Sequence, residues 1–164
     1  GSNAPLAFVG CVECSAVHNT IVDPTNWVIR ILQETASTAE YTFSPARDGR
    51  VVNNIVYFAR SELSTTVNVG PDTAPETFEL ANNLWYAYDA PEQSDPAGEL
   101  PVAEVGGIYG EDPQFADPGA DDYDVPAGSP AAGAGSSEPA SAGGDLEGEC
   151  YPRPPTIGAW AEGE

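Results

Sequence analysis

The feature that most constrains how this chain can fold is a short pattern that occurs three times. In each copy an Asn is followed directly by β-branched or aromatic residues: VHNTIVD at 17–23, VNNIVYF at 52–58 and ANNLWYA at 81–87. Aligning the copies brings Asn19, Asn54 and Asn83 into register, at spacings of 35 and 29 residues. Such spacings are typical of stacked structural repeats. The apolar runs are short and rich in strand-forming residues, so each copy predicts a strand.

The segments between the copies are rich in turn residues and predict loops. One of them, Trp27–Ser37, allows two interpretations, because its apolar residues match one face of a helix while Val28–Ile31 alternates as a strand does. Among strand repeats we favour the strand. Two longer stretches, Gln33–Arg50 and Ala90–Val105, are expected to be inserted loops, the second of them a polar excursion on the surface.

The chain is strongly acidic, with 26 Asp and Glu against five Arg and no Lys, for a net charge of −21. Residues 1–70 carry a net charge of −2 and residues 71–164 a net charge of −19. Phosphate backbones and anionic lipids would repel such a surface, so we expect no nucleic-acid partner. No apolar run is long enough to span a bilayer, so we expect no membrane insertion.

Two interpretations of the acidity stay open, a highly solvated surface and binding of Ca²⁺ by hard oxygen ligands. We expect no other cofactor. The calcium candidates lie in one acidic turn whose spacing differs from that of an EF-hand: Asp117, Asp121, Asp122 and Asp124.

The cysteines are an odd number, Cys11, Cys14 and Cys150, so at least one thiol stays unpaired within the chain. A disulfide from Cys150 to Cys11 or Cys14 would join the C-terminus to the first repeat. The three thiols and His18 could also form a four-ligand zinc site. Free thiols are the remaining interpretation.

Two segments near the C-terminus carry a resemblance to a known family. GEDPQFADPGADDYDVPAGSPAAGAG at 110–135 and DLEGECYPRPPTIGAWAE at 145–162 resemble the closing segments of extracellular bacterial β-helix proteins. With the Asn repeats, they make Leu6–Glu162 similar to the C-terminal part of a right-handed parallel β-helix, the pectate-lyase-like solenoid. The resemblance implies an all-β fold of three to four C-terminal coils with long loops and an irregular C-terminal tail. It also implies that the Asn residues form a ladder at the bends between strands.

The resemblance suggests an organisation along the chain. Residues 1–4 read as the remnant of a cleaved tag, and the lack of Met indicates a piece of a longer protein. Residues 5–132 would hold the coils and the closing segment. Residues 133–149 read as a flexible linker, and residues 150–164 as a C-terminal segment that docks on the body through Ile157 and Trp160.

The function implied is a non-catalytic, extracellular or cell-surface fragment that caps the solenoid and contacts polysaccharide. The alternatives are part of the cleft of a polysaccharide lyase or glycoside hydrolase, and an adhesin-like interaction module. No catalytic constellation is recognisable in the sequence. The exposed first coil is expected either to self-associate or to be covered by Leu6–Val12. The candidate carbohydrate contacts are Trp27, Arg30, Tyr57, Trp85 and Tyr86.

Overall fold

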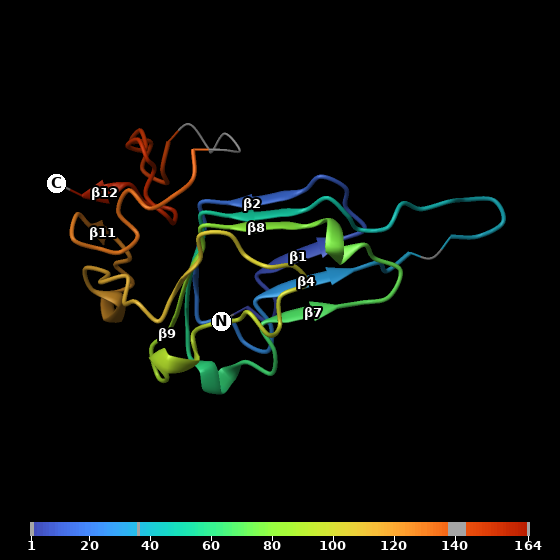
Figure 1. Ribbon diagram of the computed structural model, residues 1–164, viewed down its shortest axis with the longest axis horizontal. Helices are drawn as coiled ribbons and strands as arrows, with labels where there is room; N and C mark the ends of the chain where they lie inside the picture. Colours follow the sequence, from blue (N-terminus) through green and yellow to red (C-terminus); the bar gives the residue numbers. More distant parts are fainter. Residues whose placement is uncertain (1, 36, 138–143, 164) are drawn as a thin grey trace.

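A computed structural model of the chain describes residues 2–35, 37–137 and 144–163 (Figure 1). The described part is mostly β, and its helices are short 3-10 turns. The strands are β1 (Leu6–Val9), β2 (Ser15–Val17), β3 (Thr20–Val22), β4 (Ile29–Leu32), β5 (Arg50–Val52), β6 (Ile55–Phe58), β7 (Val67–Val69), β8 (Glu79–Ala81), β9 (Leu84–Ala87), β10 (Ile108–Tyr109), β11 (Val125–Pro126) and β12 (Glu162–Gly163). The 3-10 turns are η1 (Arg60–Glu62), η2 (Pro75–Thr77), η3 (Pro91–Gln93) and η4 (Pro118–Ala120).

Strand pairing follows a simple rule, in which β1 to β6 each pair in parallel with the third strand that follows. The result is three stacked sheets, in the orders β1-β4-β7, β2-β5-β8 and β3-β6-β9, and β10 extends the third beyond β9. A fourth, two-stranded sheet pairs β11 with β12. We call each set of three consecutive strands a level: level 1 is β1–β3, level 2 is β4–β6 and level 3 is β7–β9. All named strand pairs are parallel, which is compatible with a parallel β-helix-like fold.

The same two-residue corner joins the second strand of each level to the third. Its first residue adopts the left-handed backbone conformation, with φ of 55° at His18, 58° at Asn53 and 50° at Asn82. Asn tolerates this conformation better than most side chains, because its short amide can bond to nearby backbone. The second corner residue is the repeated Asn of the sequence pattern, and the strand register places the three copies in line.

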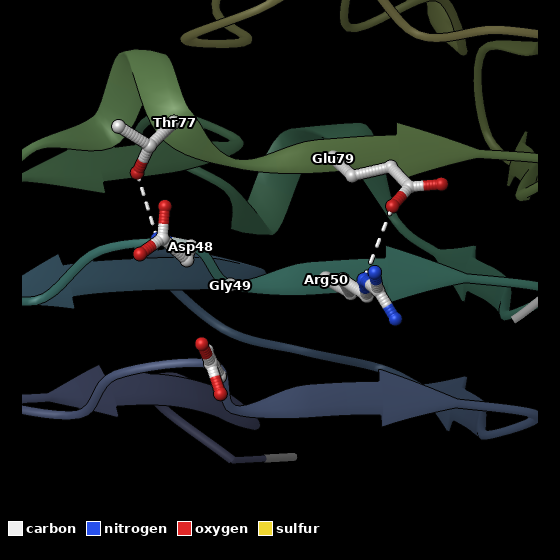
Figure 2. A pocket seen from close by; sticks show the side chains of 6 residues that line it. Asp48, Gly49, Arg50, Thr77 and Glu79 are labelled. Carbon is white, nitrogen blue, oxygen red and sulfur yellow. Dashed lines mark hydrogen bonds and ion pairs between the residues drawn. The ribbon is translucent and has the colours of Figure 1, made fainter.

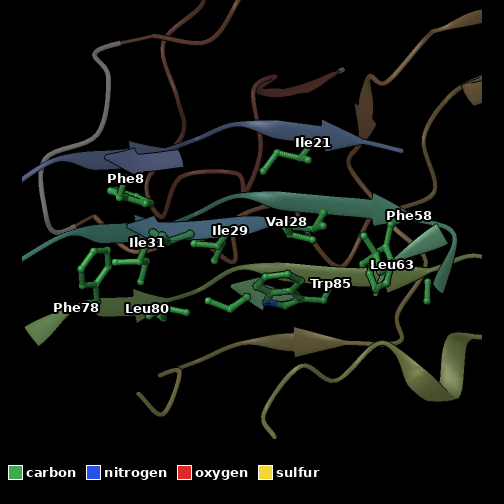
Figure 3. Packing of buried hydrophobic residues seen from close by; sticks show 14 of the residues in the cluster. Phe8, Ile21, Val28, Ile29, Ile31, Phe58, Leu63, Phe78, Leu80 and Trp85 are labelled. Atoms are coloured by element: carbon green, nitrogen blue, oxygen red, sulfur yellow. The ribbon is translucent and has the colours of Figure 1, made fainter. Parts of the chain in front are cut away.

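The main core lies between the three sheets and is filled by the inward-pointing residues of all levels (Figure 3). Phe8 packs edge-on against Phe78, with 5.2 Å between ring centroids. Trp85 and Phe58 are both fully buried there. Gly49 leaves the space that the Phe78 ring occupies, since a Cβ on Gly49 would lie 2.2 Å from Phe78 Cε1. The backbone at Gly49 and the Phe78 ring are therefore close-packed, as protein interiors usually are.

A second apolar cluster lies on the outer face of the β3-β6-β9-β10 sheet. Ile55 and Leu84 point outward from β6 and β9, yet both are fully buried. They are covered by the chain that follows β10, which supplies Phe115, Val125 and Ile157. The sheet is therefore buried on both faces, as parallel sheets usually are.

The segment 91–105, which we call the plug, closes the main core beyond level 3. Leu100 and Val102 pack against the core cluster, so the expected surface excursion is instead a cover. The carboxylate of Glu99 holds the plug by accepting bonds from the Thr66 amide and, at 2.9 Å, from the Thr65 hydroxyl. Its Pro-rich, polar composition hid two apolar residues that a folded plug can bury.

Other segment predictions can be compared directly with the structure. Residues 29–32 form a strand, β4, which confirms the strand interpretation over the helix. Leu6–Val9 pairs with β4 as part of level 1 and does not fold over that level as a lid. The stretch after β4 is a long loop that projects away from the sheets in Figure 1, and Ala36 within it lies outside the described residues.

The termini are partly held to the body. Ser2 and Asn3, within the predicted tag remnant, accept backbone bonds from Thr25 at 2.8 Å and Trp27 at 3.2 Å, and Gly1 lies outside the described residues. In the predicted linker, Gly135 and Ser136 both donate backbone bonds at 2.8 Å to the folded body, and residues 138–143 lie outside the described part. None of the helices in the described ranges has the length and apolar composition that a bilayer span requires.

Candidate functional site

Asn19, Asn54 and Asn83 form one hydrogen-bonded column, which we call the Asn ladder. Asn54 Oδ1 accepts bonds from the Asn19 backbone N–H at 2.9 Å and from Asn19 Nδ2 at 2.8 Å. Asn83 Oδ1 accepts the same pair of bonds from Asn54, again at 2.9 and 2.8 Å. Asn54 and Asn83 are fully buried, so these bonds satisfy groups that would otherwise be costly to bury.

The ladder ends at Glu104 of the plug. Glu104 Oε1 accepts from the Asn83 backbone at 3.0 Å and from Asn83 Nδ2 at 2.6 Å, and so replaces the Asn oxygen of a further level. Its Oε2 accepts from Trp85 Nε1 at 2.9 Å and from the Tyr109 hydroxyl at 3.0 Å. Gly107 makes room for it, since a Cβ there would lie 2.8 Å from Oε2.

Burial raises the pKa of Glu104 above its usual range, and the four donated bonds oppose that rise. An ionised carboxylate only accepts hydrogen bonds. The Glu104 side chain can therefore accept the bonds of Asn83 but has no N–H to donate to a further level. Sequence reasoning missed Glu104 because it is not an Asn. The signal that could have revealed it is the GGIY run at 106–109, which matches the earlier copies with Gly in the ladder position.

The closing segment, which we define as residues 144–163, docks on the corner that contains His18. The Tyr151 ring stacks on the buried His18 ring with 4.2 Å between centroids, and its hydroxyl donates to the Gly158 carbonyl at 2.8 Å. His18 Nδ1 lies 3.3 Å from that same carbonyl, and the Gly158 N–H donates to the Asn53 carbonyl at 2.9 Å. Gly158 is required here, because a Cβ would lie 2.7 Å from Ile55 Cδ1.

Asp145 organises the closing segment from within. Its Oδ1 accepts backbone bonds from Glu147 at 3.0 Å and Glu149 at 2.8 Å, and its Oδ2 accepts from Ala161 at 2.9 Å. These amides hold the pKa of the Asp145 carboxyl below its usual value, against the opposing effect of burial. Ile157 is fully buried in the outer apolar cluster, and Trp160 lies 6.4 Å from Tyr123 between ring centroids.

A group of tyrosines with nearby carboxylates lies on the outer face of the β6 and β9 strands. We call it the tyrosine surface: Tyr57, Tyr86, Tyr88, Asp23 and Asp112. The Tyr57 ring lies 4.9 Å from Tyr88 and 5.8 Å from Tyr86, centroid to centroid. Tyr88 is 40% exposed, and its hydroxyl donates to Asp23 Oδ1 at 2.8 Å. Burial and then Asp23 raise the pKa of Tyr88 to about 12. Burial and then Asp112 raise the pKa of Tyr57 and Tyr86 as well, so the three rings stay neutral hydrogen-bond donors at pH 7.

The five predicted carbohydrate contacts do not form one platform. Tyr57 and Tyr86 belong to the tyrosine surface, as the alternation of strand residues implies. Trp85 is wrong as a contact, because it is fully buried and its indole donates to Glu104. Trp27 and Arg30 lie at β4, in another sheet, where the guanidinium lies 4.8 Å from the Trp27 ring centroid.

A polar groove of about 550 Å³ lies along the outer face of the β2-β5-β8 sheet (Figure 2). Its charged lining residues are Glu13, Asp48, Arg50 and Glu79. Arg50 Nε is 3.1 Å from Glu79 Oε2, and Arg47 beside the groove is paired with Asp48. None of these acids is buried. A glycosidase needs an acid whose pKa is raised by its surroundings, and the groove offers no desolvated carboxyl for that role.

The predicted metal and disulfide residues are not brought together. In the described ranges, no three His, Cys, Asp or Glu side chains converge as metal ligands would, either at the Asp117–Asp124 turn or around His18. All three thiols are free. Tyr151, next to Cys150, stacks on His18 at the end of β2, whereas Cys14 directly precedes the start of β2.

The acidic turn is instead organised by its own backbone. Asp117 and Asp122 form an isolated antiparallel bridge around η4. Asp121 adopts the left-handed conformation, with φ of 60°, and Asp122 Oδ1 accepts the Asp124 N–H at 3.2 Å. The geometry thus gives these acids a role in the turn and gives the calcium hypothesis no support.

Comparison with protein-family models, with curated proteins and with solved structures found no match to this chain. The pectate-lyase-like resemblance therefore rests on the quoted sequence motifs and on the parallel strand arrangement.

Proposed function

We propose that this chain is the non-catalytic closing end of a right-handed parallel β-helix from an extracellular bacterial protein, and that it caps the solenoid. The observation that carries the proposal is the end of the Asn ladder at Glu104. Beyond it, the chain stops adding full levels and folds back over the outer face of the β3-β6-β9-β10 sheet. The plug covers the main core at the same end.

Capping is a physical need of stacked folds. The last level of a stack has an apolar end and unpaired strand edges, which invite association with other chains. Here the plug covers that apolar end. The chain that follows β10, including Ile157 of the closing segment, buries Ile55 and Leu84, which would otherwise expose apolar side chains to water. Two devices thus protect the stack: the plug, with its Glu104, covers the end beyond level 3, and the closing segment docks on the corners and outer sheet face of levels 1 and 2.

The part of the proposal in which the closing segment covers the outer face of the sheet is tested with Gly158→Ala. The new Cβ would meet Ile55, and φ at this position is 103°, where side chains are strained. We expect a loss of about 1–3 kcal/mol in the free energy of unfolding and faster thermolysin cleavage within the closing segment. The matched control is Gly128→Ala, since no atom lies within 4 Å of its added Cβ. Equal stability and equal cleavage in both variants would contradict the proposal.

We propose further that the tyrosine surface contacts a glycan. Neighbouring tyrosine rings offer flat faces for sugar rings. Asp23, beside Tyr88, and Asp112, beside Tyr86, offer acceptors for sugar hydroxyls. With a net charge of −21, the protein would repel polyuronates, so the favoured ligand is a neutral polysaccharide. Contact without catalysis fits the polar groove, in which both arginines are neutralised by carboxylates.

The glycan contact is tested by affinity electrophoresis in gels that contain neutral polysaccharides. Tyr88→Ala should weaken binding by about fivefold, equivalent to about 1 kcal/mol for one lost aromatic contact. Tyr41→Ala is the control, because Tyr41 is 65% exposed on the loop after β4, away from the tyrosine surface. The absence of retardation for the unmodified protein in all neutral gels would remove this part of the proposal.

A further inference from the structure

We propose that the free end of level 1 is a directional docking site for one more parallel strand level, which carries an amide donor at its corner and is supplied by polypeptide ahead of Leu6 in the full-length protein. This inference rests on the proposed function, because it assigns the partner of the end that the cap leaves open. The proposed docking site consists of the unpaired edges of β1, β2 and β3, on the side away from level 2, and the ladder residue Asn19.

The strand edges of level 1 are open. β1, β2 and β3 each lie at the end of their sheet order, with a paired neighbour on one side within the described part of the chain. A parallel strand that pairs on one side leaves alternate N–H and C=O groups free on the other. At the opposite end of the stack the plug and Glu104 cover the core and end the ladder. The stack therefore has one end covered by the plug and one end whose strand edges are open.

The Asn ladder gives the open end a direction. At each step, the backbone N–H and the Nδ2 of one Asn both donate to the side-chain oxygen in the next level. Asn54 Oδ1 and Asn83 Oδ1 each receive such a pair of donors. Among the described residues, no donor reaches Asn19 Oδ1, although Asn19 donates as the others do. The missing partner is therefore a backbone N–H together with a side-chain amide.

The open end also presents apolar surface that a further level would cover. A hollow of about 350 Å³ at this end is lined by residues of β1 and β2 and by both cysteines of the CVEC run. Leu6, Cys11, Cys14 and Ala16 line it and are partly buried against the main core. Burial in an apolar setting, with Cys14 beside it, raises the pKa of Cys11 to about 11, so its thiol is neutral and packs as an apolar group.

A second copy of this chain fits the open end poorly. Two copies placed head to head would set one Asn19 Oδ1 against another, and neither oxygen can donate a bond. A head-to-tail arrangement would need a free ladder end beside Glu104, where a carboxylate and the plug already lie. Only a level stacked in the same sense brings donors to Asn19 Oδ1. This argues against the self-association expected from the sequence.

The test extends the chain by one level. A copy of residues 67–86 is placed ahead of Leu6 and adds three strands and a corner that contains the copied Asn83. A copy of residues 23–28, the segment that joins β3 to β4, connects the added strands to Leu6. Amide hydrogen exchange of β1–β3 is compared with that in the unextended protein. We expect exchange at the open-edge amides of β1–β3 to slow by about tenfold or more.

Two variants of the extended protein isolate the ladder. Copied Asn83→Asp removes both side-chain donors and brings a carboxylate toward Asn19 Oδ1, so protection should be lost. Copied Asn82→Asp makes the same charge change at the adjacent corner residue and should keep protection. Equal protection in both variants would overturn the proposal, as would a dimer of the unextended protein with β1–β3 already protected. Failure of the added level to dock, beside a normal effect of Gly158→Ala, would sink this inference and leave the capping function standing.

Discussion

At the scale of single residues, the corner positions show how the same backbone need is met by different side chains. His18, Asn53 and Asn82 all adopt the left-handed conformation, and Gly106 adopts it with φ of 69° ahead of β10. His18 differs from the other three because its ring is buried under Tyr151 of the closing segment. One corner of the stack therefore carries a titratable group at the point where the closing segment docks.

This burial predicts a pH dependence. Burial lowers the pKa of His18 below its ordinary value of 6.5, although bonds to the Gly158 and Thr156 carbonyls oppose the shift. As the pH falls, the unfolded chain takes up a proton first, so stability is lost from about pH 6.5 downward toward the lowered pKa of the folded state. Glu104 changes stability in the opposite direction with pH. Its raised pKa adds stability below pH 4.5, and this contribution is lost as the pH rises from 4.5 through the raised pKa of the folded state.

The variant His18→Asn removes the titratable ring of His18 and leaves Glu104 in place, so it isolates the pH dependence that His18 causes. Asn is chosen because Asn53 and Asn82 occupy the equivalent corner position in levels 2 and 3. Urea unfolding of both proteins is measured from pH 8 to pH 5. The variant should lose some stability at every pH through the missing ring contact. Its deficit relative to the unmodified protein should shrink as the pH falls below about 6.5. A deficit that is constant with pH would refute the role assigned to His18.

At the scale of elements, the Asn ladder joins the equivalent corners of three successive levels into one hydrogen-bonded unit. Asn54 is its centre, and Asn54 Nδ2 also donates to the Ala16 carbonyl at 3.0 Å and the Val52 carbonyl at 3.1 Å. Replacing Asn54 by Ala would leave several buried groups of levels 1, 2 and 3 without partners. The cost should exceed that of an ordinary lost hydrogen bond.

Asn54→Ala is expected to lower the free energy of unfolding by about 3 kcal/mol, measured by urea denaturation. Asn68→Ala serves as the control, since Asn68 lies on β7, is half-buried and accepts one bond from Arg30 at 3.3 Å. That variant should change stability by no more than about 0.5 kcal/mol. Similar losses in the two variants would mean that the ladder is no more important than an edge contact.

The elements also show how far the sequence alone predicts this molecule. The period of the Asn pattern predicts the stacked strands and their register, because turn chemistry and strand propensity coincide at each copy. Alternation shows that Trp85 and Tyr86 point to opposite sides, but it does not say which side is the core. The roles of Glu104 and the plug depend on contacts between distant segments, and neither shares the pattern that marks the earlier levels.

At the scale of the whole molecule, charge is the dominant property. Twenty of the 26 acids lie in residues 71–164 with a single Arg, and this half supplies the plug and the closing segment. Three ion pairs are present in the described part of the chain, and all three involve Arg from the first half. Most carboxylates of residues 71–164 take part in none of these ion pairs, so they repel one another.

Repulsion of this kind predicts stabilisation by salt. Raising NaCl to about 0.5 M should increase Tm by several degrees, since screening weakens repulsion between exposed charges. CaCl2 at matched ionic strength distinguishes screening from specific binding, and the geometry of the acidic turn leads us to expect no additional rise. A Tm that falls or stays constant with NaCl would show that acid repulsion is not a large term in the stability.

The direction of the Asn ladder has a consequence for how proteins of this design change in length over evolution. Every interior level offers the same acceptor to the level before it and the same two donors to the level after it. A duplicated interior level can therefore enter the stack without any compensating substitution in its neighbours. A level added after Glu104 would find no acceptor of the right kind and no free core. Chains of this type are thus expected to lengthen by internal duplication, with the closing end inherited unchanged.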